Sequence, residues 1–387
     1  MTEPRPDAGP RPGPGLAELV STRHVLVCCG TGGVGKTTTA AALAIAGARA
    51  GRRTVVLTID PAKRLADTLG AGALGNLPQA LPRVRWDPDG RAPDTGQLDA
   101  LMLDAAATFE AVVRDQATSP EQAERILGNR FARSVAGALS GTQEYMAAEK
   151  LYELHTSGDY DLIVVDTPPT RHALDFLDAP DHLARLLRNR VFRLLMTPGR
   201  VSWRLAGTAV HALLRRITRV VGGAVIDDLM TFLRAFEGME AGFAARGHDA
   251  RALLADPSSA FVVVTTPRRD ALEETATFAA GIRARHLTLD AVVVNRVHAP
   301  FADAGPVDQL RAQAAQAAER APDLSAALTT LADLAADGRA EHARVRATAA
   351  VLAVPQVVMV SAQPRDAVDV ATLDAIVVEL LDRAGAV

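Results

Sequence analysis

The chain has 387 residues with 42 Lys or Arg and 45 Asp or Glu, which gives a formal net charge of −3. This balance provides no basic footprint for nucleic acid, so we expect no nucleic-acid partner. The length allows one large α/β domain with an insertion, or two to three smaller domains. The two cysteines, Cys28 and Cys29, are adjacent and cannot form a disulfide framework, which favours a reducing, cytoplasmic compartment.

The amino-terminal segment is rich in proline and glycine. Residues 1–15 read MTEPRPDAGPRPGPG, with two acidic residues and no apolar run. A signal peptide requires an apolar h-region, so this segment is not one. We expect a disordered arm over residues 1–20 and a folded chain over residues 21–387.

A glycine-rich loop, GTGGVGKTT at residues 30–38, lies between an apolar run and an Ala-rich helical pattern. Its spacing matches G-x-x-x-x-G-K-[ST], in which backbone N–H groups surround a phosphate. The lysine of this motif reaches the β and γ phosphates, and the hydroxyl that follows it binds Mg²⁺. A glycine-rich turn is the alternative, but the flanking strand and helix supply the context that the motif requires. The predicted ATP-binding residues are Gly30, Gly32, Gly33, Val34, Gly35, Lys36, Thr37 and Thr38.

Short apolar runs alternate with helical patterns along the rest of the chain, which is typical of a doubly wound, mostly parallel α/β sheet. Helical periodicity dominates at about 104–157, in an insertion at about 180–250, and at 306–351. The run from Leu98 to Leu103 is interrupted by Asp99, which makes it the least regular of the predicted strands. The predicted strands are Val25–Cys29, Thr54–Ile59, Leu98–Leu103, Leu162–Asp166, Phe261–Thr265, Ala291–Asn295 and Val357–Val360.

Two acidic residues follow predicted strands at the edge where open α/β sheets bind ligands. Asp166 ends an apolar run in the manner of a Walker B acid, which holds Mg²⁺ through its water shell. Asp60 lies where a carboxylate can position the attacking water. For both residues the alternative is an N-cap of the next helix, because Asp is favoured there.

Four ordered motifs, GGVGKTT, DPAKRLADTLG, DTPPTRHALDFLDAP and VVVNRV, resemble those of the arsenite-pump ATPase family. This family includes the ATPase that delivers tail-anchored membrane proteins, and the resemblance runs from Val25 to the C-terminus. It implies a P-loop ATPase domain in which Asp60 lies in the first switch, Asp166–His172 form the second switch, and Asn295 binds adenine. An Asn side chain can both donate to and accept from an adenine edge, although a turn-forming Asn is the alternative.

The chain departs from the family in the phosphate loop. Members usually have a lysine directly after the first loop glycine, which reaches the nucleotide of the other subunit of a dimer, whereas this chain has Thr31. Loss of such a cation can slow phosphoryl transfer by orders of magnitude. Either the chain pairs with a paralogous ATPase that retains the lysine, as the resemblance to actinobacterial-type members favours, or Lys63, Arg64 or Arg171 substitutes for it. The alternative for these three is a solvated helix face.

Metal and anion ligands known in the family are also missing. The chain has neither the Cys-x-x-Cys pair that holds zinc between subunits in the targeting members nor the cysteine cluster that binds arsenite in the pump. We therefore expect Mg²⁺ and ATP as cofactors, and no zinc.

The helical insertion bears on what the ATPase does. Leucine and methionine recur in it at helical spacing, as in Ile226, Leu229, Met230, Leu233 and Phe236, which is usually a core pattern. By resemblance, this region forms the client groove of the targeting members. Arg204, Arg215, Arg216 and Arg219 are too many charges for a spanning helix. We take a soluble packed helix as the default, with a peripheral or groove-lining helix as the alternative.

The leading hypothesis is a Mg²⁺-dependent, cytoplasmic ATPase that acts as a dimeric nucleotide-controlled switch on a hydrophobic protein client or membrane-linked complex. It forms a homodimer or a heterodimer, and peripheral membrane association stays open. The alternatives are the ATPase subunit of an arsenite-type anion pump and a low-turnover nucleotide-binding regulatory subunit paired with an active paralogue.

Overall fold

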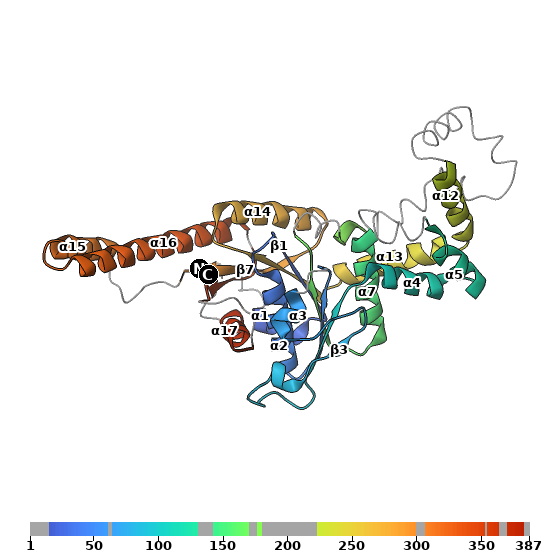
Figure 1. Cartoon of the computed structure of the whole chain (residues 1–387), viewed down its shortest axis with the longest axis horizontal. Helices are drawn as coiled ribbons and strands as arrows, with labels where there is room; N and C mark the ends of the chain where they lie inside the picture. Colours follow the sequence, from blue (N-terminus) through green and yellow to red (C-terminus); the bar gives the residue numbers. More distant parts are fainter. Residues whose placement is uncertain are drawn as a thin grey trace, which may run out of the picture.

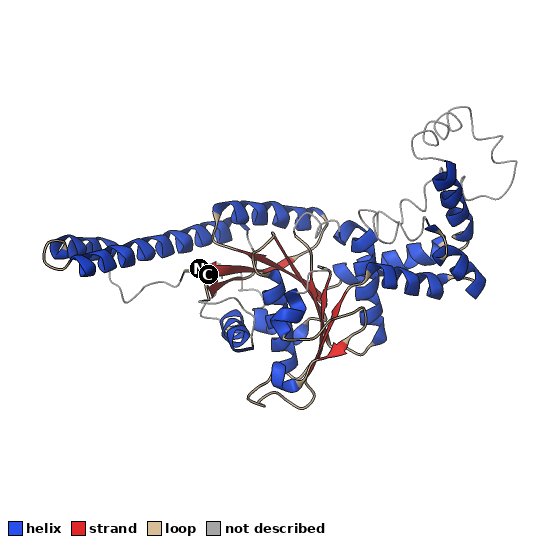
Figure 2. Ribbon diagram, viewed as in Figure 1, coloured by secondary structure: helices blue, strands red, loops and turns tan. Residues whose placement is uncertain are grey.

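A computed structural model describes residues 15–60, 64–130, 142–169, 176–179, 223–298, 306–352, 354–363 and 370–382. In this part of the chain an eight-stranded sheet has the order β3-β4-β2-β5-β1-β6-β7-β8. Every neighbouring pair is parallel except β3 and β4, so the predicted doubly wound fold is confirmed (Figures 1 and 2). The strands are β1 (Val25–Gly30), β2 (Arg53–Thr58), β3 (Gln79–Ala80), β4 (Gln97–Met102), β5 (Leu162–Asp166), β6 (Ser259–Thr265), β7 (Leu289–Val297) and β8 (Val357–Ser361).

All seven predicted strands are present, and their apolar runs are buried on both faces of the sheet. The side chains of Cys28 and Cys29 belong to opposite hydrophobic clusters, as neighbouring strand residues must. Asp99 is tolerated in β4 because it accepts a hydrogen bond from the Tyr160 hydroxyl at 2.7 Å. Only β3, two exposed residues at the sheet edge, had no sequence signal.

One face of the sheet is covered by helices from the two ends of the described chain, as Figure 1 shows. Helix α2 is rich in alanine and lies very close to the strands: a Cβ built at Gly47 would meet the Leu162 side chain at 2.5 Å. Glycine and alanine at these positions therefore set the distance between helix and sheet. The helices are α1 (Leu16–Thr22), α2 (Lys36–Arg49), α3 (Arg64–Leu69) and α17 (Val370–Leu381).

Helix α1 corrects the predicted extent of the arm. We expected disorder over residues 1–20, but the structure has helix from Leu16, and Leu16 and Leu19 are fully buried in the core. Three apolar residues at helical spacing, Leu16, Leu19 and Val20, bury enough surface to order this segment against the domain. The remainder of the predicted arm, residues 1–14, lies outside the described residues.

The other face of the sheet packs against helices that follow or precede its strands. These are α7 (Thr142–Ser157), α13 (Glu240–Ala255), α14 (Arg269–Ala284) and α16 (Pro322–Leu352). Helix α16 continues beyond the sheet and pairs with α15 (Val307–Ala317) in a hairpin that projects from the body (Figure 1). The predicted helical stretch at 306–351 is thus confirmed as two helices.

A third hydrophobic cluster joins helices beside the sheet: α4 (Ala105–Gln116), α5 (Pro120–Leu127), α12 (Gly223–Ala235), α13 and the first turns of α7. We call this group the helical module; it lies to the right of the sheet in Figure 1. Leu233 and Phe236, from the stripe predicted in the insertion, are buried in its core, which supports the core interpretation for that stripe. Residues 180–222 of the insertion, including the arginines at 204, 215, 216 and 219, lie outside the described residues. None of the helices in the described part of the chain is long and apolar enough to cross a membrane.

A buried charge network fastens α7 to the helical module. Glu149, which is 1% exposed, accepts hydrogen bonds from the Tyr145 hydroxyl at 2.6 Å and from Arg246 Nε at 2.7 Å. The same hydroxyl lies 3.2 Å from the Phe243 carbonyl oxygen, and Arg246 also pairs with Asp115 at 3.1 Å. Because Glu149 is buried, these partners replace the water that would otherwise contact its carboxylate.

We predict that Arg246→Ala lowers the free energy of unfolding by about 2–4 kcal/mol, because it leaves Glu149 buried without its cation. Urea unfolding followed by far-UV circular dichroism measures this. The control is Arg114→Ala, whose exposed guanidinium pairs with Glu110 and Glu124 on the surface, and which should lower the stability far less. Equal losses in the two variants would contradict the role assigned to the buried pair.

Candidate nucleotide site

The loop between β1 and α2 carries the glycines that its backbone requires. Gly35 has φ of 97°, and a Cβ there would lie 2.2 Å from Asn295 Nδ2. Gly30 has φ of 150°, and a Cβ there would lie 2.1 Å from the Val264 carbonyl oxygen on β6. The loop therefore keeps its backbone N–H groups accessible only with glycine at both positions. It lies at the carboxyl edge of the parallel strands, where such sheets bind ligands.

Lys36 begins α2 with its side chain folded over the loop. Its ammonium donates a hydrogen bond to the Thr31 carbonyl oxygen at 2.8 Å, and the residue is only 8% exposed. Burial lowers the pKa of Lys36, while the negative charge of Asp166 acts in the opposite direction. The ammonium thus occupies the concave side of the loop, where a phosphate group would compete successfully with a neutral carbonyl for its protons.

Asp166, at the end of β5, is held by two hydroxyl groups. Its Oδ2 accepts hydrogen bonds from Thr37 Oγ1 at 2.8 Å and from Thr58 Oγ1 at 3.0 Å. Its Oδ1 is buried and has no hydrogen-bond partner among the residues that the structure describes. Desolvation raises the pKa of Asp166 to about 6, against the opposing effects of the two hydroxyls and Lys36.

This arrangement fits a magnesium ion. A buried carboxylate oxygen without a partner is energetically costly unless a cation or a metal-bound water satisfies it. The site offers only oxygen donors, a carboxylate and a threonine hydroxyl, which is the donor set that Mg²⁺ prefers. Thr37 and Asp166, predicted as metal residues from positions 129 apart in the chain, meet directly.

Asp60 lies two residues beyond the end of β2, on the same edge of the sheet. The Ile59 backbone N–H donates to the Asp166 carbonyl oxygen at 3.0 Å, which ties this segment to β5. The carboxylate of Asp60 is 28% exposed and lies 3.7 Å from the Arg64 guanidinium. Arg64, one of the three cations considered as substitutes for the missing lysine, is therefore near Asp60; Lys63 and Arg171 lie outside the described residues. The same holds for residues 170–172 of the second switch.

Asn295, on β7, contacts the phosphate loop directly. Its Nδ2 donates to the Val34 carbonyl oxygen at 2.8 Å, and its Oδ1 accepts from the Arg296 backbone N–H at 2.9 Å. The amide retains a second N–H and a second lone pair, so it can still bind the edge of a base. The contact with an adenine ring stays a prediction.

Three contacts at the site had no sequence prediction. The Thr58 hydroxyl on β2 supports Asp166, and the Thr167 hydroxyl donates to the Cys28 carbonyl oxygen at 2.8 Å. Gln143, at the start of α7, donates through Nε2 to the Ile59 carbonyl oxygen at 2.9 Å. For Thr58 and Thr167, the available sequence signal was a threonine at or directly after the end of a strand, β2 and β5 respectively. Gln143 had no such signal.

A glycine-rich loop between a strand and a helix, with its lysine and threonine facing a buried strand-end aspartate, defines the class of P-loop nucleotide hydrolases. A family model described as "Anion-transporting ATPase" matches residues 22–321. The chain belongs to this family of ATPases, and the resemblance found in its motifs is confirmed.

Individual relatives agree with this assignment. An uncharacterized protein of Streptomyces coelicolor is 33% identical over 278 residues, which cover 71% of this chain and 62% of that protein. "ATPase ASNA1 homolog 1" of Paramecium tetraurelia is 32% identical over 42% of this chain and 45% of its own length. "ATPase GET3" of Phaeosphaeria nodorum is 26% identical over 73% of this chain and 79% of its own length. The chain thus spans about half to two thirds of the first two relatives.

We predict that Asp166→Asn abolishes stabilisation by Mg²⁺ with ADP while preserving the fold. The amide retains an oxygen for the Thr37 and Thr58 hydroxyls but no longer supplies a charged oxygen to the cation. In EDTA, the melting temperature of the variant should equal or exceed that of the wild type, because a desolvated carboxylate is removed. In Mg²⁺ and ADP at about 100 times Kd, only the wild type should gain about 3 kcal/mol. An equal gain in the variant would rule out Asp166 as the magnesium residue.

Proposed function

We propose that this chain is a Mg²⁺-dependent ATPase that works as a dimeric, nucleotide-controlled switch on a hydrophobic protein client or a membrane-linked complex. The observation that carries the proposal is the direct contact between Thr37 of the phosphate loop and the buried carboxylate of Asp166, beside Lys36. Family membership supports hydrolysis of ATP as the reaction.

In this proposal, different residues bind the phosphates and the magnesium ion. The loop amides from Gly32 to Thr38 and the N-terminus of α2 bind the β and γ phosphates. Lys36 leaves the Thr31 carbonyl oxygen and donates to phosphate oxygens, so its hydrogen bond is exchanged for a stronger, charge-assisted one. Thr37 and Asp166 hold the magnesium ion, directly and through its water shell. When bound there, the ion would supply positive charge that offsets the negative charge developing on the phosphate oxygens.

Asp60 is proposed to orient the attacking water. Its carboxylate is partly exposed, and it follows a segment fixed to β5 by the hydrogen bond from the Ile59 N–H. A carboxylate in this place can accept a hydrogen bond from water and hold the oxygen in line with the γ phosphate.

The connection from the site to the helical module supports the role as a switch. Gln143 contacts the Ile59 carbonyl oxygen beside Asp60, and two residues later Tyr145 is buried in the core of the module. A movement of the segment around Asp60 on hydrolysis would therefore act on α7, and through Glu149 and Arg246 on α13. The relatives named ATPase GET3 and ATPase ASNA1 homolog lead us to a hydrophobic client bound by this module.

Two alternatives are less well supported. An arsenite-type pump subunit needs accessible thiolates, but Cys28 and Cys29 are the only cysteines of the chain and both are buried in β1. Burial raises the pKa of Cys29 to about 12, which keeps it a thiol. A low-turnover regulatory subunit remains a candidate because Thr31 replaces the lysine that would assist a partner subunit.

We predict that the purified chain releases phosphate from ATP and that Asp60→Asn lowers this turnover by at least about 100-fold. The ATP Kd should change by less than about threefold, because the loop and Lys36 are intact. The matched control is Asp67→Asn, an exposed aspartate on α3, which should leave turnover unchanged. Phosphate release and fluorescent-nucleotide binding measure the two quantities.

The outcome separates the candidate functions. Turnover that persists in Asp60→Asn would refute Asp60 as the water-orienting residue. Tight ATP binding with no turnover in the wild type, but turnover in Thr31→Lys, would favour the subunit that depends on a paralogue's lysine. Stimulation of turnover by arsenite would support the pump instead.

We also predict nucleotide-dependent binding of a hydrophobic helix. A soluble carrier bearing a segment of about 20 apolar residues should bind the chain in one of the ATP-bound and ADP-bound states at least about tenfold more tightly than in the other. Asp60→Asn traps the ATP-bound state for this comparison. The control carrier has four leucines of the segment replaced by aspartate. Equal affinity in both nucleotide states would contradict the switch.

A further inference from the structure

The chain bends sharply directly after Asn295. Arg296 has φ of 59°, in the left-handed region that residues other than glycine seldom adopt, and the register of β7 with β8 shifts between Val294 and Val297. Such a conformation persists only where the surroundings hold it on both sides. On one side, Asn295 accepts the Arg296 N–H and donates to the Val34 carbonyl oxygen of the phosphate loop. The bend therefore directs Asn295 onto the nucleotide loop.

The far side of the bend is held by α16. A single carboxylate oxygen, Glu341 Oε2, lies 2.9 Å from the His298 backbone nitrogen, which donates to it, and 3.0 Å from His298 Nδ1. The neighbouring His342 donates through Nε2 to the His298 carbonyl oxygen at 3.2 Å. The Glu341 side chain is only 14% exposed, although α16 projects into solvent over much of its length.

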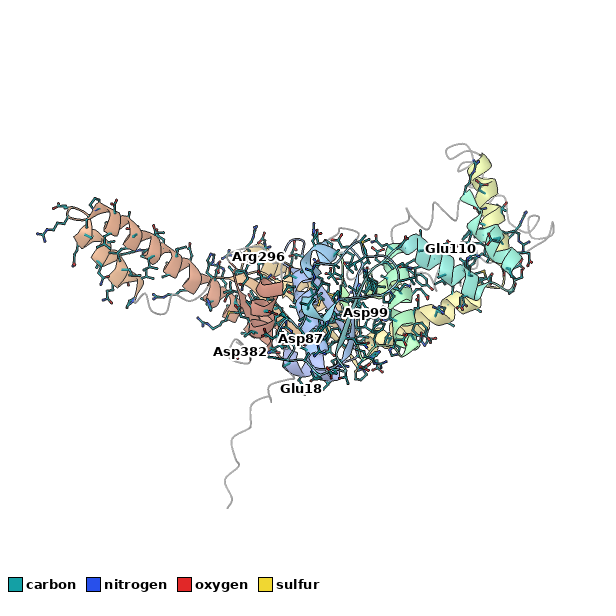
Figure 3. The ribbon with its side chains drawn as sticks, turned by 60° about the horizontal axis from the view of Figure 1, so that its bottom comes forward. Glu18, Asp87, Asp99, Glu110, Arg296 and Asp382 are labelled. Atoms are coloured by element: carbon teal, nitrogen blue, oxygen red, sulfur yellow. The ribbon has the colours of Figure 1, made fainter. Side chains whose placement is uncertain are left out.

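The same part of α16 holds a second strand end. Arg344 Nε donates to the Pro267 carbonyl oxygen at 3.2 Å, in the segment that follows β6. Val345 is buried in the core cluster of this face of the sheet, which fixes the helix in position. The base of α16, residues 338–352, thus fastens the segments after β6 and β7. Arg296 lies where this helix meets the sheet (Figure 3).

We propose that Glu341 is a positioning residue for nucleobase binding: by clamping His298 it maintains the bend at Arg296 and so holds Asn295 against the phosphate loop. Glu341 does not touch the nucleotide and acts only through the strand end. The base of α16 is consequently coupled to occupancy of the base site, while the phosphates are bound independently. This inference rests on the proposed role of Asn295 in binding the base.

A metal site at this cluster is not the explanation. Among the residues that the structure describes, no group of three or more His, Cys, Asp or Glu is arranged to hold a metal ion. One carboxylate oxygen already receives both His298 donors, and His342 is directed to a carbonyl oxygen. The cluster is built to fix a backbone segment.

The test compares ATP with inorganic tripolyphosphate, which carries the phosphates without a base. Calorimetric titration of the full chain in Mg²⁺ gives both Kd values. Glu341→Ala should weaken ATP binding by about tenfold, the usual effect of losing a hydrogen bond to a charged group, and change the tripolyphosphate Kd by less than about twofold. Glu341→Gln keeps one acceptor oxygen and should fall between the wild type and Glu341→Ala.

The matched control is Asp333→Ala on the same helix. Asp333 is exposed and pairs with Arg311 at 3.3 Å on the projecting part of the hairpin, away from the strand ends. It should leave both Kd values unchanged. Amide hydrogen exchange gives a second readout: ATP, but not tripolyphosphate, should slow exchange in residues 338–348 of the wild type, and Glu341→Ala should abolish this difference.

Each remaining outcome overturns the inference. Equal ATP affinity in Glu341→Ala and Asp333→Ala would show that the clamp has no effect on base binding. Equal weakening of ATP and tripolyphosphate would show a general structural role. A wild type that binds tripolyphosphate as tightly as ATP would remove the role of Asn295 and leave the phosphate loop, whereas a wild type that binds neither would refute the proposed function itself.

Discussion

The desolvated carboxylate of Asp166 is the constraint on which the site depends. Its position at the end of a central parallel strand removes it from water, and this desolvation is the largest cause of the raised pKa of Asp166, about 6. Two hydroxyls, from Thr37 on α2 and Thr58 on β2, donate to one carboxylate oxygen, while the other has no partner in the described part of the chain. The fold thus places an incompletely satisfied carboxylate beside the phosphate loop. In the function proposed above, a divalent cation with its nucleotide would satisfy this carboxylate, and the folded chain would be most stable with both bound.

The segments that follow the neighbouring strands connect this site to helices on its two sides. Toward the helical module, Gln143 on α7 donates to the Ile59 carbonyl oxygen, directly before Asp60. Further along α7, Glu149 pairs with Arg246 of α13 in the module. Toward the projecting hairpin, Asn295 and His298 join the phosphate loop to Glu341 on α16. In the function proposed above, the γ phosphate would act on α7 and the base on α16, so hydrolysis and nucleotide exchange would have separate structural consequences.

The sequence predicted those features that local pattern determines. Buried parallel strands are near-continuous apolar runs, so seven of the strands could be predicted from the sequence. The spacing of the loop motif was sufficient to identify Lys36 and Thr37. The contacts that could not be predicted join residues far apart in the sequence, and they depend on how strands and helices are aligned with one another. Thr58 is 108 positions from Asp166 and meets it only because β2 pairs with β5 in one alignment. Glu341 is 43 positions from His298 and has no motif. The disordered arm was predicted to extend to residue 20, because the proline and glycine content was given more weight than the short apolar pattern at Leu16 and Leu19, which forms a helix.

The position of Thr31 has a consequence for how the switch is controlled. In a loop with a lysine at this position, one subunit supplies a cation to the other, and closure of the dimer is joined to catalysis. Here Thr31 is buried and its carbonyl oxygen accepts a hydrogen bond from the Lys36 ammonium, so the loop holds its own cation in place without a nucleotide. A phosphate that binds to Lys36 must first break that hydrogen bond. The positive charge is therefore already at the loop, but the side chain must still reorient toward the phosphate. A cation supplied later, by Arg64 next to Asp60 or by a paralogous partner, would then act on hydrolysis alone and leave binding unaffected.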